Sequence, residues 1–275
     1  MEMREKGWLR AGQVRKRVHR TFQAGLDLVF PPQVGCLVCG GDLLTRGIID
    51  LCHHCLERLP LVGDSFCCGC GRPLPPSKTH CQDCTELQHF FVQNRAVAIY
   101  SGPLKEQIQG VKYRHDRRLG VALGEVMGLV AKRRKWIPRG AHLLSVPLHH
   151  QRLRQRGYNQ AELLLQGIER YHNGPILKPG SIIRREATDV SSKLSPLERR
   201  RNLQGVFFVP RPGIVAGKVL CVIDDIYTTG ATLDEIARTL LKAGAKEVHG
   251  LTLSIAVSDQ DLLNTAATAR GLASC

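Results

Sequence analysis

The residues that decide the fold lie near the C-terminal end of the chain, where Val219–Thr232 reads VLCVIDDIYTTGAT. The apolar, largely β-branched start of this stretch is typical of a strand buried in a parallel sheet. Apolar residues then recur at helical spacing until Gly244, at Leu233, Ile236, Ala237, Leu240 and Leu241. A second apolar run, Val248–Val257, follows. The order strand, loop, helix and strand predicts an α/β fold with its ligand-binding loop at the carboxyl end of a strand.

The loop combines an anion cradle with two carboxylates. Small residues at a helix N-terminus expose backbone N–H groups, and threonine hydroxyls add donors, so the loop is suited to hold a phosphate. The residues assigned to this cradle are Thr228, Thr229, Gly230, Ala231 and Thr232. Asp224 and Asp225 would repel a phosphate, so we expect them to accept hydrogen bonds from vicinal hydroxyls or to bind a divalent cation. A phosphate beside a diol describes a ribose 5-phosphate.

The cysteines indicate a separate metal-binding module. Four Cys-x-x-Cys pairs occur, at Cys36/Cys39, Cys52/Cys55, Cys67/Cys70 and Cys81/Cys84. Such pairs let both sulfurs reach one tetrahedral ion, and without signs of export they favour Zn²⁺ over disulfides. The simplest pairing is sequential, with the first four cysteines on one zinc and the last four on another, although the spacing also allows a crossed pairing. Closed Cys₄ sites leave no open position, so both zinc ions would be structural.

The charge of the chain is concentrated in its middle. The formal net charge is +15, and residues 103–218 hold 23 Lys and Arg against 8 Asp and Glu. Such a segment attracts phosphates, pyrophosphate or nucleic acid. No apolar stretch approaches the ~20 residues that span a bilayer. Residues 1–30 lack the apolar core of a secretion signal, so we expect a cytoplasmic protein without a membrane span.

Together these motifs resemble the ComF/ComFC family, in which a double zinc ribbon precedes a type I phosphoribosyltransferase domain. Val222–Thr232 resembles the phosphoribosyl-pyrophosphate (PRPP) signature of those enzymes. The further matching segments are Tyr100–Gly102, Lys112-Tyr113, Val146–Leu148, Arg156–Gln160, Leu194-Ser195, Arg199–Asn202 and Phe207. The resemblance covers roughly residues 30–257 and implies an α/β fold of the type I phosphoribosyltransferase kind, a parallel sheet flanked by helices, after an N-terminal double zinc-ribbon module.

The same resemblance implies a domain order. We expect a basic N-terminal helix or extension at residues 1–30 and the double zinc ribbon at 31–92. The phosphoribosyltransferase domain would occupy residues 93–258, and residues 259–275 would form a C-terminal tail.

The resemblance also implies that PRPP binds with Mg²⁺. Asp224 and Asp225 would form the catalytic pair on the ribose hydroxyls, and the threonine loop would hold the 5-phosphate. Arg156, Gly157 and Asn159 are the candidates for the pyrophosphate loop, since Arg offers forked donors to phosphate oxygens and Gly lets the backbone approach.

Residues 184–201 correspond to a mobile loop that closes over the site and excludes water in such enzymes. Its candidate residues are Arg184, Arg199 and Asn202. Thr188 is present, but Ser191 stands where the family commonly has Gln, so this lid departs from the pattern.

Two functions follow from the resemblance. One is an enzyme that transfers a phosphoribosyl group from PRPP to an acceptor that the sequence does not identify. The other is a non-catalytic protein that uses the fold as a platform to bind single-stranded DNA during natural transformation, with competence proteins as partners. The basic segment fits the second function, whereas an aromatic content of 5% leaves few platforms for base stacking.

Overall fold

The computed structural model describes residues 35–43, 49–186 and 196–258, and the chain divides into two compact units, residues 1–52 and 53–275. The predicted N-terminal extension at 1–30 and the predicted tail at 259–275 lie outside the described residues. The first unit contains a knuckle in which Cys36 N–H donates to the Gly41 carbonyl and Gly40 N–H to the Cys36 carbonyl, both at 2.8 Å. Gly40 has a φ of +69°, the positive value that such a turn requires.

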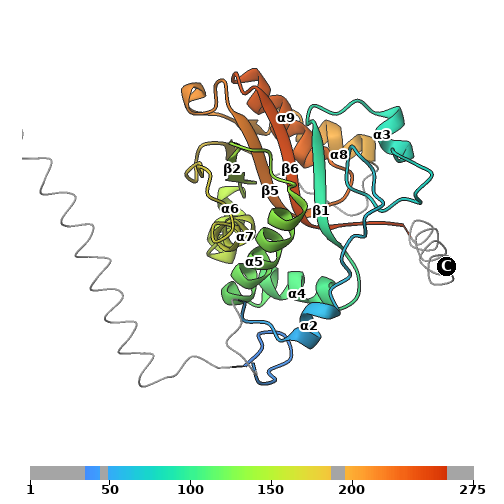
Figure 1. Cartoon of the computed structure of the whole chain (residues 1–275). Helices are drawn as coiled ribbons and strands as arrows, with labels where there is room; N and C mark the ends of the chain where they lie inside the picture. Colours follow the sequence, from blue (N-terminus) through green and yellow to red (C-terminus); the bar gives the residue numbers. More distant parts are fainter. Residues whose placement is uncertain (1–34, 44–48, 187–195, 259–275) are drawn as a thin grey trace, which may run out of the picture. The chain divides into compact units, whose positions relative to one another are not determined.

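A four-stranded parallel sheet forms the centre of the second unit (Figure 1). Its strands are β1 (Gln93–Ile99), β6 (Glu247–Ile255), β5 (Val219–Tyr227) and β2 (His142–Ser145), in that spatial order. The ladder between β5 and β6 runs from Val219 beside Glu247 to Tyr227 beside Ile255, so β5 continues through the acidic pair. The predicted parallel sheet is confirmed, and its central strand is longer than its apolar run because β6 pairs with it throughout.

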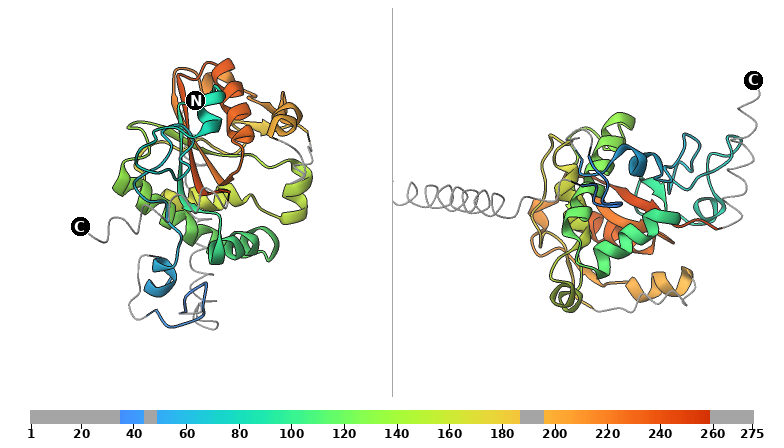
Figure 2. Two further views of the ribbon diagram at one scale, coloured as in Figure 1. Left: turned by 90° about the vertical axis from the view of Figure 1, so that its right-hand side faces the viewer. Right: turned by 90° about the horizontal axis from the view of Figure 1, so that it is seen from below.

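Helices cover both faces of this sheet. They are α4 (Gly102–Tyr113), α5 (Arg117–Arg134), α6 (His150–Arg156), α7 (Gln160–Ile168), α8 (Pro196–Leu203) and α9 (Ala231–Lys242). Two shorter helices, α2 (His53–Glu57) and α3 (Gln82–Glu86), each begin directly after the first cysteine of a pair and contain the second one, Cys55 and Cys84. A 3₁₀ turn, η1 (Pro212–Ile214), precedes β5. In the right-hand view of Figure 2, α5 and α8 lie on opposite sides of the sheet.

The close packing of α5 against α7 depends on glycine. A Cβ at Gly124 of α5 would lie 2.2 Å from the Leu164 carbonyl oxygen, and a Cβ at Gly167 of α7 would lie 2.2 Å from the Val121 carbonyl oxygen. Because real side chains never approach so closely, these two glycines allow the helix backbones to touch. The contact fixes the face of the sheet on which α7 begins.

One predicted loop is a helix. The predicted pyrophosphate loop contains Arg156, whereas residues 150–156 form α6. Gly157, with φ +73°, ends this helix, and its N–H donates to the Leu153 carbonyl at 2.7 Å. Arg152, Arg154 and Arg156 are therefore presented from a helical turn rather than from an extended loop.

The second group of cysteines shares the core of the sheet. Cys67, Cys70 and Cys81 are buried in the same cluster as Val222 and Tyr227 of β5. Asn94 of β1 is fully buried, its N–H donates to the Gly69 carbonyl at 2.7 Å, and its side-chain Nδ2 donates to the Cys70 carbonyl at 2.9 Å. This part of the cysteine-rich segment therefore belongs to the compact unit that contains the sheet.

None of the helices in the described part of the chain combines the length and the apolar character needed to cross a bilayer.

Candidate functional site

Eight cysteines form two groups, each of which brings four sulfur atoms within 4.8 Å of one another. The groups are Cys36, Cys39, Cys52 and Cys55, and Cys67, Cys70, Cys81 and Cys84. All of these cysteines are free rather than joined in disulfides. The sequential pairing is confirmed and the crossed pairing is excluded, and the sulfur clusters fit two structural, tetrahedral Zn²⁺ sites.

Hydrogen bonds favour the thiolate form of one cysteine in each group, Cys36 and Cys67, whereas in the second group they raise the pKa of Cys70 and Cys84. Burial raises the pKa of Cys36, but backbone hydrogen bonds, the strongest from Cys52, outweigh it and lower this pKa to about 6. Side-chain hydrogen bonds from the other three cysteines of the second group hold the pKa of Cys67 far below its usual range. Cys81 N–H also donates to Cys67 Sγ at 3.3 Å. Because the thiolate is the form that binds metal, Cys36 and Cys67 are the ligands that charge favours, and the grouping of four sulfur atoms is the evidence for each zinc site.

The loop between β5 and α9 forms a small pocket at the carboxyl end of the sheet. Gly230 is the N-cap of α9 with φ +75°, and a Cβ there would lie 2.2 Å from the hydroxyl of Tyr227. Only glycine fits this position, as the sequence predicts for a phosphate-binding turn. Five of the predicted residues line the pocket: Asp224, Thr228, Gly230, Ala231 and Thr232. Thr229 is half-buried and lies outside this lining.

The two adjacent carboxylates lie on opposite faces of β5, because side chains alternate along a strand. Asp224 is half-buried in the pocket beside α9, whereas Asp225 is buried among residues of α4, α5 and α7. There Asp225 forms an ion pair with Lys112, the penultimate residue of α4. Burial raises the pKa of Asp225, but the Lys112 charge outweighs it and lowers that pKa. Burial and the charge of Asp225 together raise the pKa of Asp224 well above its usual value.

Arg184 lies within electrostatic reach of both Asp224 and Arg152. Burial and the nearby charge of Arg152 lower the pKa of Arg184, while the carboxylate of Asp224 acts in the opposite direction. Arg184 lies in β3 (Ile183–Arg184), which pairs with β4 (Phe207–Phe208). Arg152, to which no sequence pattern assigned a role, belongs to α6.

The predicted pyrophosphate residues have different surroundings. Arg156 donates to the side-chain oxygen of Gln160, which lines the small cavity beside Asp225, and its guanidinium lies 5.7 Å from the centre of the Tyr113 ring. Asn159 is 3% exposed and caps α7, accepting a hydrogen bond from Ala161 N–H at 3.0 Å. Its Nδ2 also donates to the Val146 carbonyl at 2.9 Å. In this geometry the Asn159 side chain positions the loop.

The lid prediction falls largely on residues that the structure does not describe. Thr188 and Ser191 lie within residues 187–195, which the structure does not describe, and the side chain of Arg199 is likewise not described. The two ends of the segment are joined where β3 pairs with β4, Ile183 beside Phe208. Asn202, in α8, is exposed. The roles of Arg184, Arg199 and Asn202 in a lid therefore stay predictions.

Sequence reasoning assigned no role to Lys112, although the residue belongs to a segment that carries the family resemblance. Its partner Asp225 is more than one hundred positions away in the chain, so no local pattern reveals the ion pair. The contacts of His89 and Arg200 with Asp234 were missed for the same reason.

Known proteins resemble this chain over most of its length. The double zinc ribbon domain family matches residues 25–85. Competence protein F of Haemophilus influenzae is 30% identical over 221 residues, which span 78% of this chain and 93% of that protein. DNA utilization protein YhgH of Escherichia coli O157:H7 is 32% identical over 217 residues, 78% of this chain and 93% of that protein. Competence protein ComFC of Bacillus subtilis is 29% identical over 235 residues, 79% and 93%.

Solved structures with weaker similarity include the allosteric regulatory enzyme of purine biosynthesis, 18% identical with a TM-score of 0.33 over 54% of this chain and 37% of that one. A hypoxanthine phosphoribosyltransferase from Staphylococcus aureus is 14% identical with a TM-score of 0.30, covering 51% of this chain and 67% of that one. The extent of the sequence similarity to the competence proteins, together with the double zinc ribbon, confirms the family resemblance. The chain belongs to the ComF family.

Proposed function

We propose that this protein binds PRPP with Mg²⁺ and transfers the phosphoribosyl group to a nucleophilic acceptor as part of DNA uptake and use. The observation that carries the proposal is the pocket at the end of β5, which combines the carboxylate of Asp224 with the N-terminal turn of α9. The names of the relatives, competence and DNA utilization proteins, support the biological setting.

The 5-phosphate would sit on the turn from Thr228 to Thr232. Backbone N–H groups at the start of α9 point toward this place, and the positive end of the helix dipole favours an anion there. The hydroxyls of Thr228, which is exposed, and Thr232, which is half-buried, are available as further donors. No side chain is needed at Gly230, and none would fit.

The ribose hydroxyls would bind Asp224, the carboxylate that lines the pocket. Asp225 would take a supporting part in which Lys112 holds its charge and orientation on the other face of β5. The carboxylate of Asp224, which lines the pocket, also offers oxygen atoms of the kind that Mg²⁺ uses as ligands. When bound with PRPP, Mg²⁺ would supply charge neutralisation at the pyrophosphate.

Transfer breaks the bond between C1 of the ribose and the pyrophosphate oxygen, and the pyrophosphate leaves with the electron pair. The acceptor forms its bond to C1 and gives up a proton to the solvent. Arg184 lies within electrostatic reach of Asp224 and of Arg152, and Arg156 contacts Gln160 beside Asp225, so these arginines would stabilise the charge that develops on pyrophosphate. The reaction therefore requires electrostatic stabilisation rather than a protein nucleophile.

Titration calorimetry with Mg²⁺ and PRPP tests this proposal. Asp224→Asn removes the charged acceptor of the ribose hydroxyls and should weaken binding roughly 10- to 100-fold. Asp64→Asn is the matched control, because the Asp64 side chain is 99% exposed and only pairs with Arg134. Equal affinity in the Asp224→Asn and Asp64→Asn variants would refute the assignment of the site.

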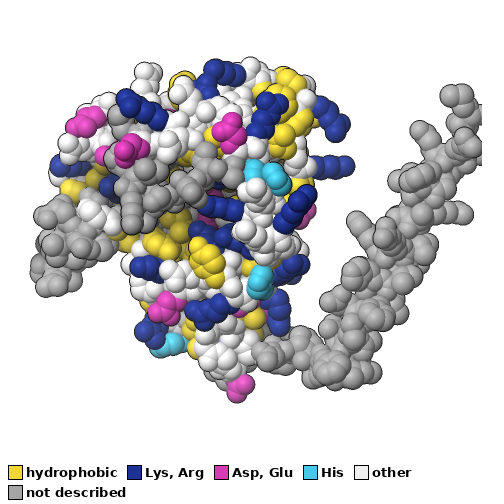
Figure 3. Space-filling view, turned by 180° about the vertical axis from the view of Figure 1, so that it is seen from behind, with side chains coloured by type: hydrophobic (Ala, Val, Ile, Leu, Met, Phe, Trp, Pro, Cys, Tyr) yellow, Lys and Arg dark blue, Asp and Glu magenta, His cyan; other side chains and the backbone are white. Residues whose placement is uncertain are grey.

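Exposed pairs of arginine and aromatic rings favour a second candidate function, binding of single-stranded DNA. The Arg185 guanidinium lies 3.5 Å from the centre of the Phe208 ring, which is 37% exposed, and Arg156 lies over Tyr113, which is 71% exposed. Lys and Arg gather along one side of the face in Figure 3. Such pairs offer stacking surfaces for bases beside donors for phosphates.

Fluorescence anisotropy with a labelled oligothymidine measures this second activity. For about three phosphate contacts, affinity should fall roughly 10- to 20-fold when the salt concentration rises fourfold. Tyr113→Ala should cost about 1–3 kcal/mol for each stacked base. Leu61→Ala removes a comparably exposed apolar side chain and is the control. Binding that does not respond to salt would contradict the phosphate contacts.

A further inference from the structure

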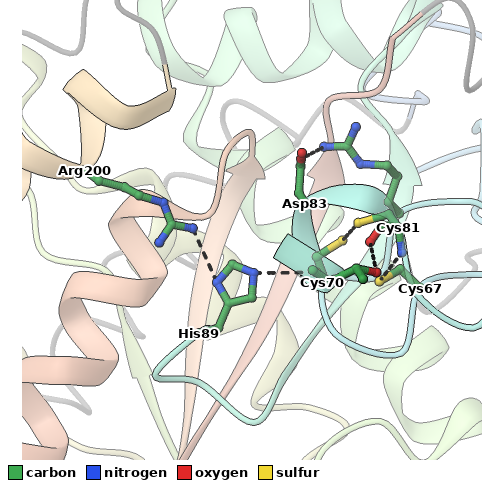
Figure 4. Close-up of polar contacts among 9 residues, drawn as sticks. Cys67, Cys70, Cys81, Asp83, His89 and Arg200 are labelled. Atoms are coloured by element: carbon green, nitrogen blue, oxygen red, sulfur yellow. Dashed lines mark hydrogen bonds and ion pairs between the residues drawn. The ribbon is translucent and has the colours of Figure 1, made fainter. Parts of the chain in front are cut away.

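His89 lies between the second cysteine group and the first turn of α9 (Figure 4). Its side chain is 8% exposed, and its Nε2 is 3.5 Å from Cys84 Sγ. Its Nδ1 is 3.5 Å from Arg200 Nη2 and 3.5 Å from Asp234 Oδ1. The imidazole stacks on Phe91 with 4.4 Å between ring centres. The buried imidazole of His89 faces the cysteine cluster with one nitrogen and Asp234 of α9 with the other. It therefore joins the cysteine cluster to the helix whose first residues belong to the phosphate loop.

Asp234 is the polar centre of this junction. Its side chain is 9% exposed, and Oδ1 accepts a hydrogen bond from Phe90 N–H at 2.7 Å. Oδ2 pairs with Arg200 Nη1 of α8 at 2.8 Å. Its own N–H donates to the Gly230 carbonyl at 2.8 Å, which closes the first turn of α9. The Asp234 carboxylate is therefore the point where three segments meet. They are the end of the second ribbon, helix α8 and the first turn of α9.

A second, aromatic connection runs beside the polar one. Phe91 packs edge to face against Tyr227 with 6.3 Å between ring centres. Tyr227 is buried, and its hydroxyl occupies the space next to Gly230 where a Cβ would lie. Burial and the nearby charges of Cys70 and Cys84 raise the pKa of Tyr227, which places this ring close to the cysteine cluster as well as to the loop.

We propose that zinc in the second ribbon positions the phosphate-binding loop through His89 and Asp234, so that zinc retention at this site and binding of a phosphate ligand are thermodynamically coupled. The proposal rests on the proposed function of the loop and assigns it a means of regulation. His89 and Asp234 are positioning residues here.

The physical reason is that zinc fixes the backbone around Cys84, and residues 85–91 carry that order to His89 and Phe90. Metal binding supplies folding free energy to the segment that it closes. Loss of zinc frees Cys84, so His89 loses the sulfur that holds Nε2, and Asp234 loses the fixed N–H of Phe90. The first turn of α9 and the α8 anchor at Arg200 then lose partners together.

Coupling is reciprocal, so a phosphate ligand must slow zinc release if zinc supports the phosphate loop. Zinc release into the chromogenic chelator 4-(2-pyridylazo)resorcinol is measured on the full chain, with and without Mg²⁺ and PRPP. The slow phase from the second site should become about 10-fold slower with PRPP, within the usual range of coupling energies. The phase from the first site, identified with a Cys39→Ser variant, should not change. Equal slowing of both phases would overturn the coupling, and slowing of neither phase would overturn coupling to PRPP.

Substitutions at His89 separate coupling from packing. His89→Gln keeps a polar side chain but not the two-sided geometry, and PRPP should then slow zinc release less than twofold. His80→Gln changes an exposed histidine of the same ribbon, next to Cys81, and should keep the full effect. Loss of stability in His89→Gln with the PRPP effect retained would show a packing role only and would overturn the proposal.

A measurement without any phosphate ligand distinguishes failure of the coupling from failure of the proposed function. Hydrogen exchange of α8 and of the first turn of α9 should be about 10-fold faster in zinc-loaded His89→Gln than in His80→Gln, as expected for weakened local structure. Faster exchange together with no effect of PRPP on zinc release would support the structural link and refute PRPP as the ligand. Unchanged exchange would refute the link itself.

Discussion

The two halves of the double zinc ribbon repeat one cysteine pattern in different surroundings. In the first group only Cys36 and Cys55 are buried and Cys39 is exposed, and the hydrogen bonds of its knuckle are local. In the second group three of the four cysteines are buried, and Asn94 binds the knuckle to β1. The Cys-x-x-Cys motif therefore predicts a metal site, but it does not predict which part of the fold that site stabilises. In the second ribbon the metal is part of the core of the sheet.

The most severe test of this contrast removes one ligand from each group. Cys70→Ser places an incomplete zinc site inside the core and should cost about 3–5 kcal/mol, or prevent folding of the sheet. Cys39→Ser removes an exposed ligand and should leave the melting temperature of the sheet almost unchanged. Zinc content by mass spectrometry and thermal denaturation by circular dichroism are the measurements. Equal destabilisation by both variants would break the distinction between the two ribbons.

Zinc release compares the two sites without any mutation. The first site has an exposed sulfur that a chelator can reach directly, whereas the second must open with the core around it. We expect the first zinc to leave at least about 10-fold faster, since opening of a buried cluster requires sub-global unfolding. Stopped-flow absorbance with the chelator resolves the two phases. A single phase, or a faster second site, would contradict the placement of the second zinc in the core.

Asn94→Ala tests the link between the second ribbon and β1. The Asn94 side chain is fully buried, and its loss leaves the Cys70 carbonyl without this donor, at a cost of about 1–3 kcal/mol. The variant should release zinc faster from the second site only. Asn173→Ala, at an exposed position, is the control and should match the unmodified chain. Unchanged release from Asn94→Ala would show that the knuckle does not depend on β1.

Local patterns predict much of this molecule because they repeat over a few residues. The strand before Asp224, the turn at Gly230 and the cysteine pairs all carry their signals within short windows, and the structure confirms each. The extension of β5 to Tyr227 could not be read from the sequence, since its acidic residues break the apolar run while pairing with β6 maintains the strand.

Contacts between distant segments were the part that the sequence could not predict. Lys112 meets Asp225, and His89 meets Asp234, only because the topology brings α4, β5 and α9 to the same end of the sheet. The cap that the Asn159 side chain forms on α7, and its hydrogen bond to the Val146 carbonyl, could not be predicted either, and its predicted contact with the ligand stays a prediction. The different burial of the two cysteine groups likewise depends on what packs around them.

The smallest effect that we expect follows from the charge of Asp224 in β5. It should change the stability of the sheet and the release of zinc from the second ribbon only. Burial and the charge of Asp225 raise the pKa of Asp224 in the folded protein, so the protonated form of Asp224 is favoured by folding. The stability that protonated Asp224 contributes to the folded protein is fully present below the usual carboxyl pKa. It is lost as the pH rises through the raised pKa of the folded state. Asp224→Asn should therefore increase the free energy of unfolding by about 1 kcal/mol at pH 7 and have little effect near pH 4.

This gain should pass to the second zinc and not to the first, because Val222 and Tyr227 of the same strand share a core with Cys67 and Cys70. Release of the second zinc from Asp224→Asn should become a few-fold slower at pH 7, as about 1 kcal/mol implies. Release of the first zinc at pH 7 should stay constant, and the difference in the free energy of unfolding should disappear near pH 4, when the wild-type carboxyl is protonated. Denaturant titration at the two pH values measures the difference in stability, and chelator kinetics at pH 7 measure zinc release from the two sites. A change at the first site, or a gain in stability that persists at pH 4, would mean that the charge of Asp224 is not the cause.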